Sequence, residues 1–238
     1  MLDQFARTRI LIGEDGIKRL QRARVAIFGI GGVGGYVVES LTRAGVGTLD
    51  LIDNDTVSTT NLNRQMVATV ETVGESKVQA MKKRCLLLNP QVNIYTHECF
   101  YLPETAEQFD FTQYDYIVDA VDTVTAKLTL IEKAKEVGVP IISCMGAGNK
   151  LHSQMFMVSD LYKTTMCPLA KVMRRECKKR GITSLKVVYS TEETVSRKED
   201  SIEETSKRQI PGSTPFAPAV AGLLLAEEVF RDLAGVES

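Results

Sequence analysis

Short apolar runs alternate with amphipathic stretches along residues 1–145 of the chain. The apolar runs predict strands at 25–30, 48–53, 92–97, 114–120 and 140–145. Apolar positions with helical spacing predict helices between them, at 34–44, 75–88 and 125–137. Strands and helices that alternate in this way form a mostly parallel sheet with helices packed on its faces. The pattern therefore predicts an α/β, Rossmann-like fold.

The alternation becomes less regular after about residue 150. We predict, in order, a strand at 153–161, a helix at 168–181, a strand at 184–190 and a C-terminal helix at about 218–233. The intervening segment 191–215 is highly charged and poor in large apolar residues, so we expect a mobile loop, which leaves open how 190–214 behaves when substrate binds. We interpret residues 1–238 as one domain, with a nucleotide-binding part at about 1–160 and a substrate-side extension at about 161–238.

The composition narrows the class of protein. The chain has five cysteines, an odd number, and none of them forms a C-x-x-C pair. This usage favours reduced thiols in the cytoplasm over a disulfide framework, and we expect no zinc. The N-terminus has no apolar signal core, and the apolar run at 219–226 is far shorter than the ~20 residues of a membrane span. We therefore expect a cytoplasmic protein without a membrane-spanning segment.

The segment "VAIFGIGGVGG" places a glycine-rich turn between a predicted strand and a predicted helix. Gly29, Gly31 and Gly34 match the G-x-G-x-x-G pattern, in which the backbone approaches a phosphate at the N-terminus of a helix. Asp53 ends the next strand, where a carboxylate binds ribose hydroxyls. These features alone favour a nicotinamide cofactor.

The segment "DNDTVSTTNLNRQ" at 53–65 changes that interpretation, because it concentrates polar side chains suited to a triphosphate. Arg64 offers two hydrogen bonds to phosphate oxygens, and Lys77 offers a compact ammonium near a predicted helix start. Asp119 and Asp122 follow a later strand, where a carboxylate is able to hold Mg²⁺ against phosphates. Together these residues favour ATP.

The motifs "GIGGVGG", "LIDNDTVSTTNLNRQ", "GESKV" and "VDAVD" resemble the ThiF/MoeB/HesA family, relatives of the ubiquitin-activating enzymes, over roughly residues 5–160. The resemblance implies that the chain adenylates a carboxylate with ATP and Mg²⁺ and releases pyrophosphate. It implies ribose binding by Asp53, a metal ligand at Asp122, and an arginine, Arg7, that reaches the neighbouring subunit of a homodimer. One departure is Thr123, where many members have asparagine.

The candidate residues form two overlapping sets. The catalytic candidates are Arg7, Arg64, Lys77 and Asp122. The ATP-binding candidates, with phosphate contacts implied for Asn61, Arg64, Gln65 and Lys77, are Gly29, Gly31, Gly32, Gly34, Asp53, Asp55, Asn61, Arg64, Gln65 and Lys77.

Two later segments, "SDLYKTTMCPLAKVMRRECKKRG" and "LKVVYSTEE", resemble the family branch that acts on tRNA carrying threonylcarbamoyladenosine. In that branch ATP activates the threonylcarbamoyl carboxylate, which then cyclises with net loss of water. The substrate supplies its own nucleophile, so such an enzyme needs activation and alignment but no acid–base triad. The form of the cyclic product and any sulfur-transfer partner are left open.

The predicted helix at 168–181 is strongly basic although the whole chain has a net charge of −1. Five basic residues fall close to one helical face and form a candidate tRNA-binding surface through phosphate contacts: Lys171, Arg174, Arg175, Lys178 and Lys179. An ordinary solvated helix face is the alternative interpretation of this pattern.

Three alternative functions remain open from the sequence. An adenylating enzyme that activates the C-terminal glycine of a small sulfur-carrier protein needs the same ATP site. A nicotinamide-dependent oxidoreductase is favoured only by the glycine turn and Asp53, and a non-enzymatic adaptor would bind ATP without turnover. Cys144 and Cys167 are interpreted as structural thiols, and a role for either is left open.

Overall fold

The computed structural model describes residues 3–196, 198–199 and 211–236. Its strands form a single seven-stranded sheet in the order β3-β2-β1-β4-β5-β7-β6. They are β1 (Arg24–Phe28), β2 (Thr48–Ile52), β3 (Asn93–His97), β4 (Tyr116–Asp119), β5 (Ile141–Cys144), β6 (Phe156–Asp160) and β7 (Lys186–Ser190). All neighbours are parallel except β6 and β7. The predicted α/β fold is therefore confirmed.

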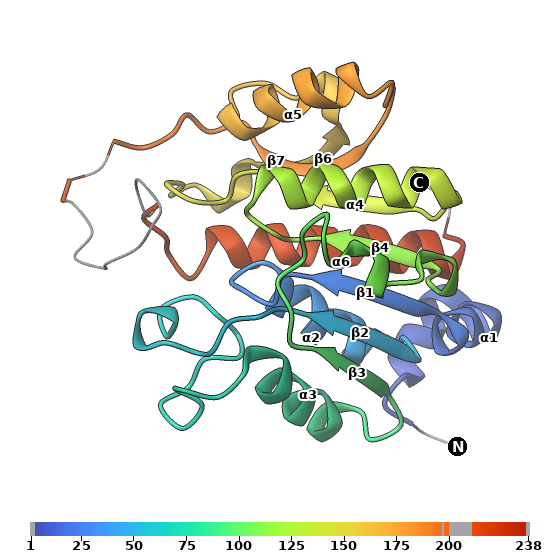
Figure 1. Ribbon diagram of the computed structural model, residues 1–238. Helices are drawn as coiled ribbons and strands as arrows, with labels where there is room; N and C mark the ends of the chain where they lie inside the picture. The colour runs from blue at the N-terminus through green and yellow to red at the C-terminus, as the bar shows by residue number, and fades with distance from the viewer. Residues whose placement is uncertain (1–2, 197, 200–210, 237–238) are drawn as a thin grey trace.

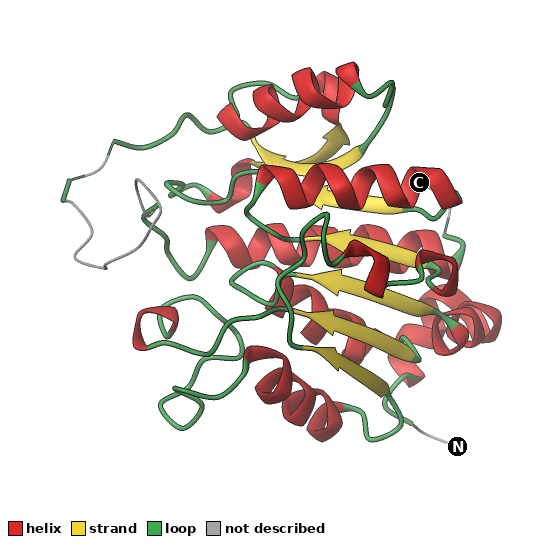
Figure 2. Cartoon of the chain, in the orientation of Figure 1, coloured by secondary structure: helices red, strands yellow, loops and turns green. Residues whose placement is uncertain are grey.

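Helices cover both faces of the sheet (Figure 2). They are α1 (Ala6–Arg22), α2 (Gly34–Ala44), α3 (Lys77–Leu88), α4 (Val124–Val137), α5 (Pro168–Lys179) and α6 (Ala217–Ala234). No helix within the described ranges is both long enough and apolar enough to span a membrane.

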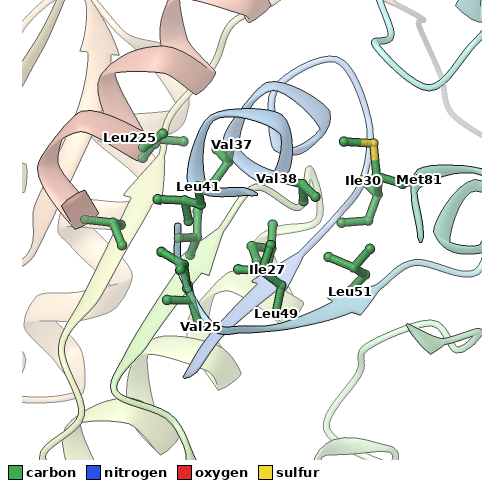
Figure 3. Packing of buried hydrophobic residues seen from close by; sticks show 14 of the residues in the cluster. Val25, Ile27, Ile30, Val37, Val38, Leu41, Leu49, Leu51, Met81 and Leu225 are labelled. Carbon is green, nitrogen blue, oxygen red and sulfur yellow. The ribbon is translucent and has the colours of Figure 1, made fainter. Parts of the chain in front are cut away.

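The central strands are buried on both faces, so their side chains belong to two separate hydrophobic cores, one on each face of the sheet. Val25 and Ile27 of β1 pack with α2, α3 and α6, as Figure 3 shows for part of this cluster. Ala26 and Phe28 point the other way and pack with α4 and α5. Side chains alternate between the faces of a strand, so a continuous apolar run is what a doubly covered parallel strand requires.

Three features differ from the expectations. The helix α1, which is interrupted by Gly13 at a φ of 69°, was not predicted. The predicted strand at 153–161 is a 3₁₀ turn followed by the shorter β6, which runs antiparallel to β7. Of the expected mobile loop at 191–215, residue 197 and residues 200–210 lie outside the described residues, and the described remainder contains no helix or strand.

The carboxyl ends of the parallel strands lie on one side of the sheet, together with the loops that follow β1, β2 and β4 (Figure 1). The chain runs from β1 outward to β2 and β3, and later returns to place β4 on the opposite side of β1. Ligands of open α/β sheets bind at this kind of switch point. The fold therefore places a binding site above the junction of β1 and β4.

Candidate functional site

The glycine-rich turn after β1 has no room for side chains at two positions. A Cβ at Gly29 would lie 2.7 Å from the carbonyl oxygen of Ala120, and the φ of Gly29 is +89°. A Cβ at Gly34, the first residue of α2, would lie only 1.8 Å from the carbonyl oxygen of Gly29. These contacts hold the turn against the end of β4 and bring the N-terminus of α2 to the switch point. Backbone amides at such a terminus favour an anion.

The outer glycines of the turn face residues that the sequence assigned to ATP. A Cβ at Gly31 would have only the Nε2 atom of Gln65 near it, at 3.9 Å. A Cβ at Gly32 would lie 3.5 Å from Cγ of Arg64 and 3.3 Å from Cβ of Pro218. The structure therefore brings Arg64 and Gln65, both assigned to phosphate contacts from the sequence, to the glycine turn.

Asp53 joins the end of β2 to the same turn. Its Oδ2 accepts a hydrogen bond from the backbone N–H of Ile30 at 2.7 Å, and its Oδ1 accepts one from the N–H of Asp55 at 2.8 Å. A carboxylate accepts about four hydrogen bonds, so acceptor capacity remains for hydroxyl groups of a ligand. Asp53 thus shapes the turn and presents a carboxylate beside it.

Lys77 is buried at the start of α3 and forms an ion pair with Asp55. Its Nζ atom lies 2.7 Å from Oδ2 of Asp55, and the two side chains are 6% and 59% exposed, respectively. The backbone N–H of Lys77 also donates to the carbonyl oxygen of Asp55. The ammonium is therefore held in place by an exposed carboxylate, from which an incoming phosphate is able to take over the contact.

The loop between β2 and α3 carries the remaining polar candidates. The side-chain Oδ1 of Asn61 accepts the N–H of Ser58 at 3.1 Å, which builds the short 3₁₀ turn before Arg64. Arg64 donates from its guanidinium to the carbonyl oxygen of Thr60 at 2.8 Å. Gln65 is 8% exposed, and among the described residues its Oε1 has no hydrogen-bond partner. A buried amide oxygen without a partner, beside a glycine turn, fits a site that receives a polar ligand.

The two aspartates after β4 have different environments. Asp119 is fully buried, and its Oδ2 lies 3.0 Å from Nζ of Lys127, whose side chain is 1% exposed. The same ammonium donates to the carbonyl oxygen of Cys144 at 2.6 Å. Asp119 is therefore occupied in a buried ion pair that ties β4 to β5, and it is not placed to bind a metal.

Asp122 is exposed in the loop between β4 and α4, where Thr123 donates to its Oδ1 at 3.3 Å. Within residues 3–196, 198–199 and 211–236, no group of three or more His, Cys, Asp or Glu side chains forms a metal cage. Mg²⁺ commonly binds one or two carboxylates, substrate phosphates and water instead of such a cage. The donor chemistry of Asp122 fits that mode of binding.

Arg7 does not join these residues within its own chain. It is an exposed residue at the start of α1, close to Phe5. The ring of Phe5 packs at Gly45, which ends α2 just before β2 begins. The start of α1, which carries Arg7, therefore lies near the amino-terminal edge of the sheet, whereas the glycine turn follows the carboxyl end of β1 (Figure 1).

The basic helix α5 lies over the far end of the sheet (Figure 1). It buries Ala170, Met173 and Cys177 and exposes Lys171, Arg175, Lys178 and Lys179. Arg174 differs from them, because it donates to the carbonyl oxygen of Thr164 at 2.9 Å. Hydrogen bonds from Lys179, Arg180 and Arg175 lower the pKa of Glu176 to about 2. Glu176 therefore neutralises part of this face, and the predicted surface is less uniformly basic than its sequence.

The cysteines near the site are buried. Burial raises the pKa of the Cys144 thiol to about 12, so the thiol stays protonated and unreactive near neutral pH. Cys167 is 4% exposed and directly precedes α5. Its Sγ packs near Gly146, where an added Cβ would lie 3.7 Å from the sulfur. These environments agree with structural thiols.

Two residues near the site were missed by the sequence interpretation. Lys127 is one, and its signal was a lysine on an otherwise apolar helix stripe. Asn149 is the other, and its Oδ1 accepts the N–H of Gly212 at 2.7 Å. Asn63, which the sequence suggested as a polar contact of the triphosphate, donates to the carbonyl oxygen of Ser213 at 3.1 Å. These contacts join segments far apart in the chain and have no local signal.

The comparisons with known proteins agree with this geometry. The model of the ThiF family matches residues 5–238. The tRNA threonylcarbamoyladenosine dehydratase of Bacillus subtilis is 39% identical over 242 residues, which cover 98% of this chain and 95% of that protein. The crystal structure of the Escherichia coli tRNA N6-threonylcarbamoyladenosine dehydratase, TcdA, in complex with ATP has a TM-score of 0.88 at 29% identity, covering 98% of this chain and 94% of that one.

Proposed function

The chain belongs to the ThiF family, and on this premise we propose that it is an ATP-dependent tRNA threonylcarbamoyladenosine dehydratase. The observation that carries this proposal is the similarity to the Bacillus subtilis dehydratase, which extends over 98% of the chain and so includes the extension beyond residue 160. An ATP site alone would equally suit an activator of a sulfur-carrier protein. Similarity over the substrate-side extension favours the tRNA substrate.

The reaction begins with attack by a carboxylate oxygen of the threonylcarbamoyl group on the α-phosphorus of ATP. The bond between the α-phosphorus and the bridging oxygen breaks, and pyrophosphate leaves. A nucleophile within the substrate then attacks the activated carbonyl carbon and releases its proton to solvent, and AMP leaves with the former carboxylate oxygen. The sum is conversion of ATP to AMP and pyrophosphate with loss of one water from the nucleoside. Alignment of reactants in one site supplies much of the acceleration of such steps.

The residues at the switch point have separate roles in this scheme. Amides of the glycine turn and the N-terminus of α2 bind phosphate oxygens, while Asp53 accepts hydrogen bonds from the ribose. Lys77 and Arg64 stabilise the negative charge that develops on the leaving pyrophosphate. Asp122 would hold Mg²⁺, which neutralises phosphate charge when bound.

We include a homodimer in the proposal, because the start of α1, which carries Arg7, lies away from the glycine turn of its own chain. On the same helix Ile10 and Leu11 are 81% and 84% exposed, which is unusual for adjacent aliphatic side chains and suits contact with a second copy. We also propose that the chain is a single domain, with its nucleotide-binding part at about 1–160. The proposed location is the cytoplasm. Lys171, Arg175, Lys178 and Lys179 would contact phosphates of the tRNA.

The test is pyrophosphate release with ATP, Mg²⁺ and tRNA that carries the open threonylcarbamoyl group, followed by mass spectrometry of the nucleosides. We expect one pyrophosphate for each modified nucleoside that loses water. The control is the same tRNA without the modification, which should give no release. No turnover with the modified tRNA, together with pyrophosphate exchange that depends on a sulfur-carrier protein, would contradict the proposal and favour the alternative.

A further inference from the structure

Residues 211–216 cross the carboxyl edge of the sheet and are fixed on both sides. Gly212 donates its N–H to Oδ1 of Asn149 at 2.7 Å and accepts the N–H of Asn149 at 2.8 Å. Asn63 then donates from Nδ2 to the carbonyl oxygen of Ser213 at 3.1 Å. One anchor therefore belongs to the loop after β5 and the other to the loop after β2. The segment is held over the region that contains the ATP site.

The end of this segment borders the glycine turn directly. Pro218, in the first turn of α6, lies 3.3 Å from the position of a Cβ on Gly32. Farther along α6, Gly222 packs so closely that a Cβ there would lie 2.4 Å from the carbonyl oxygen of Val33. The first turns of α6 are therefore packed against the start of α2, which fixes the residue that precedes α6.

That residue is Phe216, whose side chain is 64% exposed. Within the described part of the chain it takes part in no ring stacking or cation–π pair, unlike the buried aromatic cluster around Phe28. Phe has no group that hydrogen-bonds to water, so exposure of its ring costs free energy that a bound partner would recover. A rigid backbone thus presents an unpaired aromatic ring beside the ATP site.

We propose that Phe216 stacks on an unpaired base of the tRNA substrate, at or next to the modified nucleoside. The inference rests on the proposed function. In that function the reactive carboxylate must reach the α-phosphate, so the nucleoside that carries it enters beside the glycine turn, where Phe216 stands. Proteins recognise unpaired RNA bases largely by stacking them on aromatic side chains. The ring of Phe216 supplies such a face without any competing charge.

The test measures kcat/KM for modified tRNA and, separately, KM for ATP in Phe216→Ala, Phe216→Leu, Phe216→Tyr and Phe216→Trp. For Phe216→Ala we expect kcat/KM for tRNA to fall roughly tenfold to a hundredfold, as for loss of one stacked base, with KM for ATP unchanged. Tyr and Trp should retain most of the activity, because they keep an aromatic face. Leu should not restore it, although it keeps an apolar side chain of similar reach.

The matched control is Leu223→Ala, which removes another exposed apolar side chain, 48% exposed, from the same helix. It should leave both constants unchanged. Equal kcat/KM for tRNA in Phe216→Ala and wild type would overturn the inference, as would full recovery in Phe216→Leu, which indicates an apolar contact and not a stacked base. Failure of wild-type protein to act on the modified tRNA would instead refute the proposed function itself, so the two failures are distinguished in one experiment.

Discussion

Lys127 has a charged side chain at a position that the helical pattern assigns to the core. It lies on the same stripe of α4 as Leu130, Ile131 and Ala134, all of which are buried. Lysine suits this position because its Nζ atom has two buried acceptors. Oδ2 of Asp119 lies 3.0 Å from Nζ, and the carbonyl oxygen of Cys144 lies 2.6 Å from it. A buried ammonium needs this set of acceptors, since removal from water is costly for a charge. The ion pair fixes the end of β4, from which the loop to Asp122 continues.

Replacement of Lys127 by methionine should lower the free energy of unfolding by about 3–5 kcal/mol, because Asp119 would remain buried without a counter-charge. Urea denaturation at neutral pH measures this loss. The double variant Asp119→Asn, Lys127→Met removes both charges and should be more stable than Lys127→Met alone. If Lys127→Met unfolded at the same urea concentration as wild type, the pair would contribute little to the fold.

At the scale of single residues, the sequence indicated which side chains lie at the site. It indicated less well which contact each side chain makes there. Gln65, Arg64 and Asp53, all assigned to the nucleotide from the sequence, lie at the glycine turn. The side-chain oxygen of Asn61, assigned to phosphate, accepts a backbone hydrogen bond from Ser58. Asparagine is common in both roles, because its amide caps turns as readily as it binds ligands. Composition and spacing do not separate the two.

At the scale of elements, the strands and the helices that cover them were predictable, because burial on two faces leaves a continuous apolar run. The N-terminal helix α1 was not. It buries only Gly16, Ile17 and Leu20, and it exposes Ile10 and Leu11, so it has no apolar stripe along its whole length. The antiparallel direction of β6 could not be predicted from the sequence either, since an antiparallel edge strand has the same local pattern as a parallel one.

Phosphate binding by the glycine turn and the N-terminus of α2 is open to a direct test. Gly31→Ala adds a methyl group where the nearest atom is 3.9 Å away, so the fold should accept it, but the methyl group would occupy space near the bound phosphates. We expect unchanged thermal stability and an affinity for ATP lower by about tenfold or more. Isothermal titration calorimetry and thermal unfolding measure the two quantities.

The control is Gly34→Ala in the same turn. Its Cβ would lie 1.8 Å from a backbone oxygen, so this variant should lose stability as well as ATP binding. Unchanged ATP affinity in Gly31→Ala would show that phosphates do not approach this face of the turn.

At the scale of the whole molecule, a site assembled from one chain lacks Arg7. The start of α1, which carries this residue, lies at the amino-terminal edge of the sheet, whereas Asp122 follows the carboxyl end of β4. If Arg7 takes part in catalysis, it does so in the site of another copy. In a twofold dimer each site would then combine Asp122 of one protomer with an arginine from its partner.

This arrangement predicts complementation between two inactive variants. Arg7→Ala and Asp122→Ala each alter an exposed side chain, so both should fold, and each alone should lose most pyrophosphate release. In a mixed dimer, the protomer with Arg7→Ala keeps its own Asp122 and receives an intact arginine from its partner, so one of its two sites is complete. Random exchange of equal amounts makes half of all dimers mixed, which restores roughly a quarter of wild-type activity. Exchange is followed by size-exclusion chromatography of differently tagged protomers, and activity by pyrophosphate release. Mixed dimers without recovered activity would place Arg7 and Asp122 in the same site of one chain, whereas full activity of Arg7→Ala alone would remove Arg7 from the mechanism.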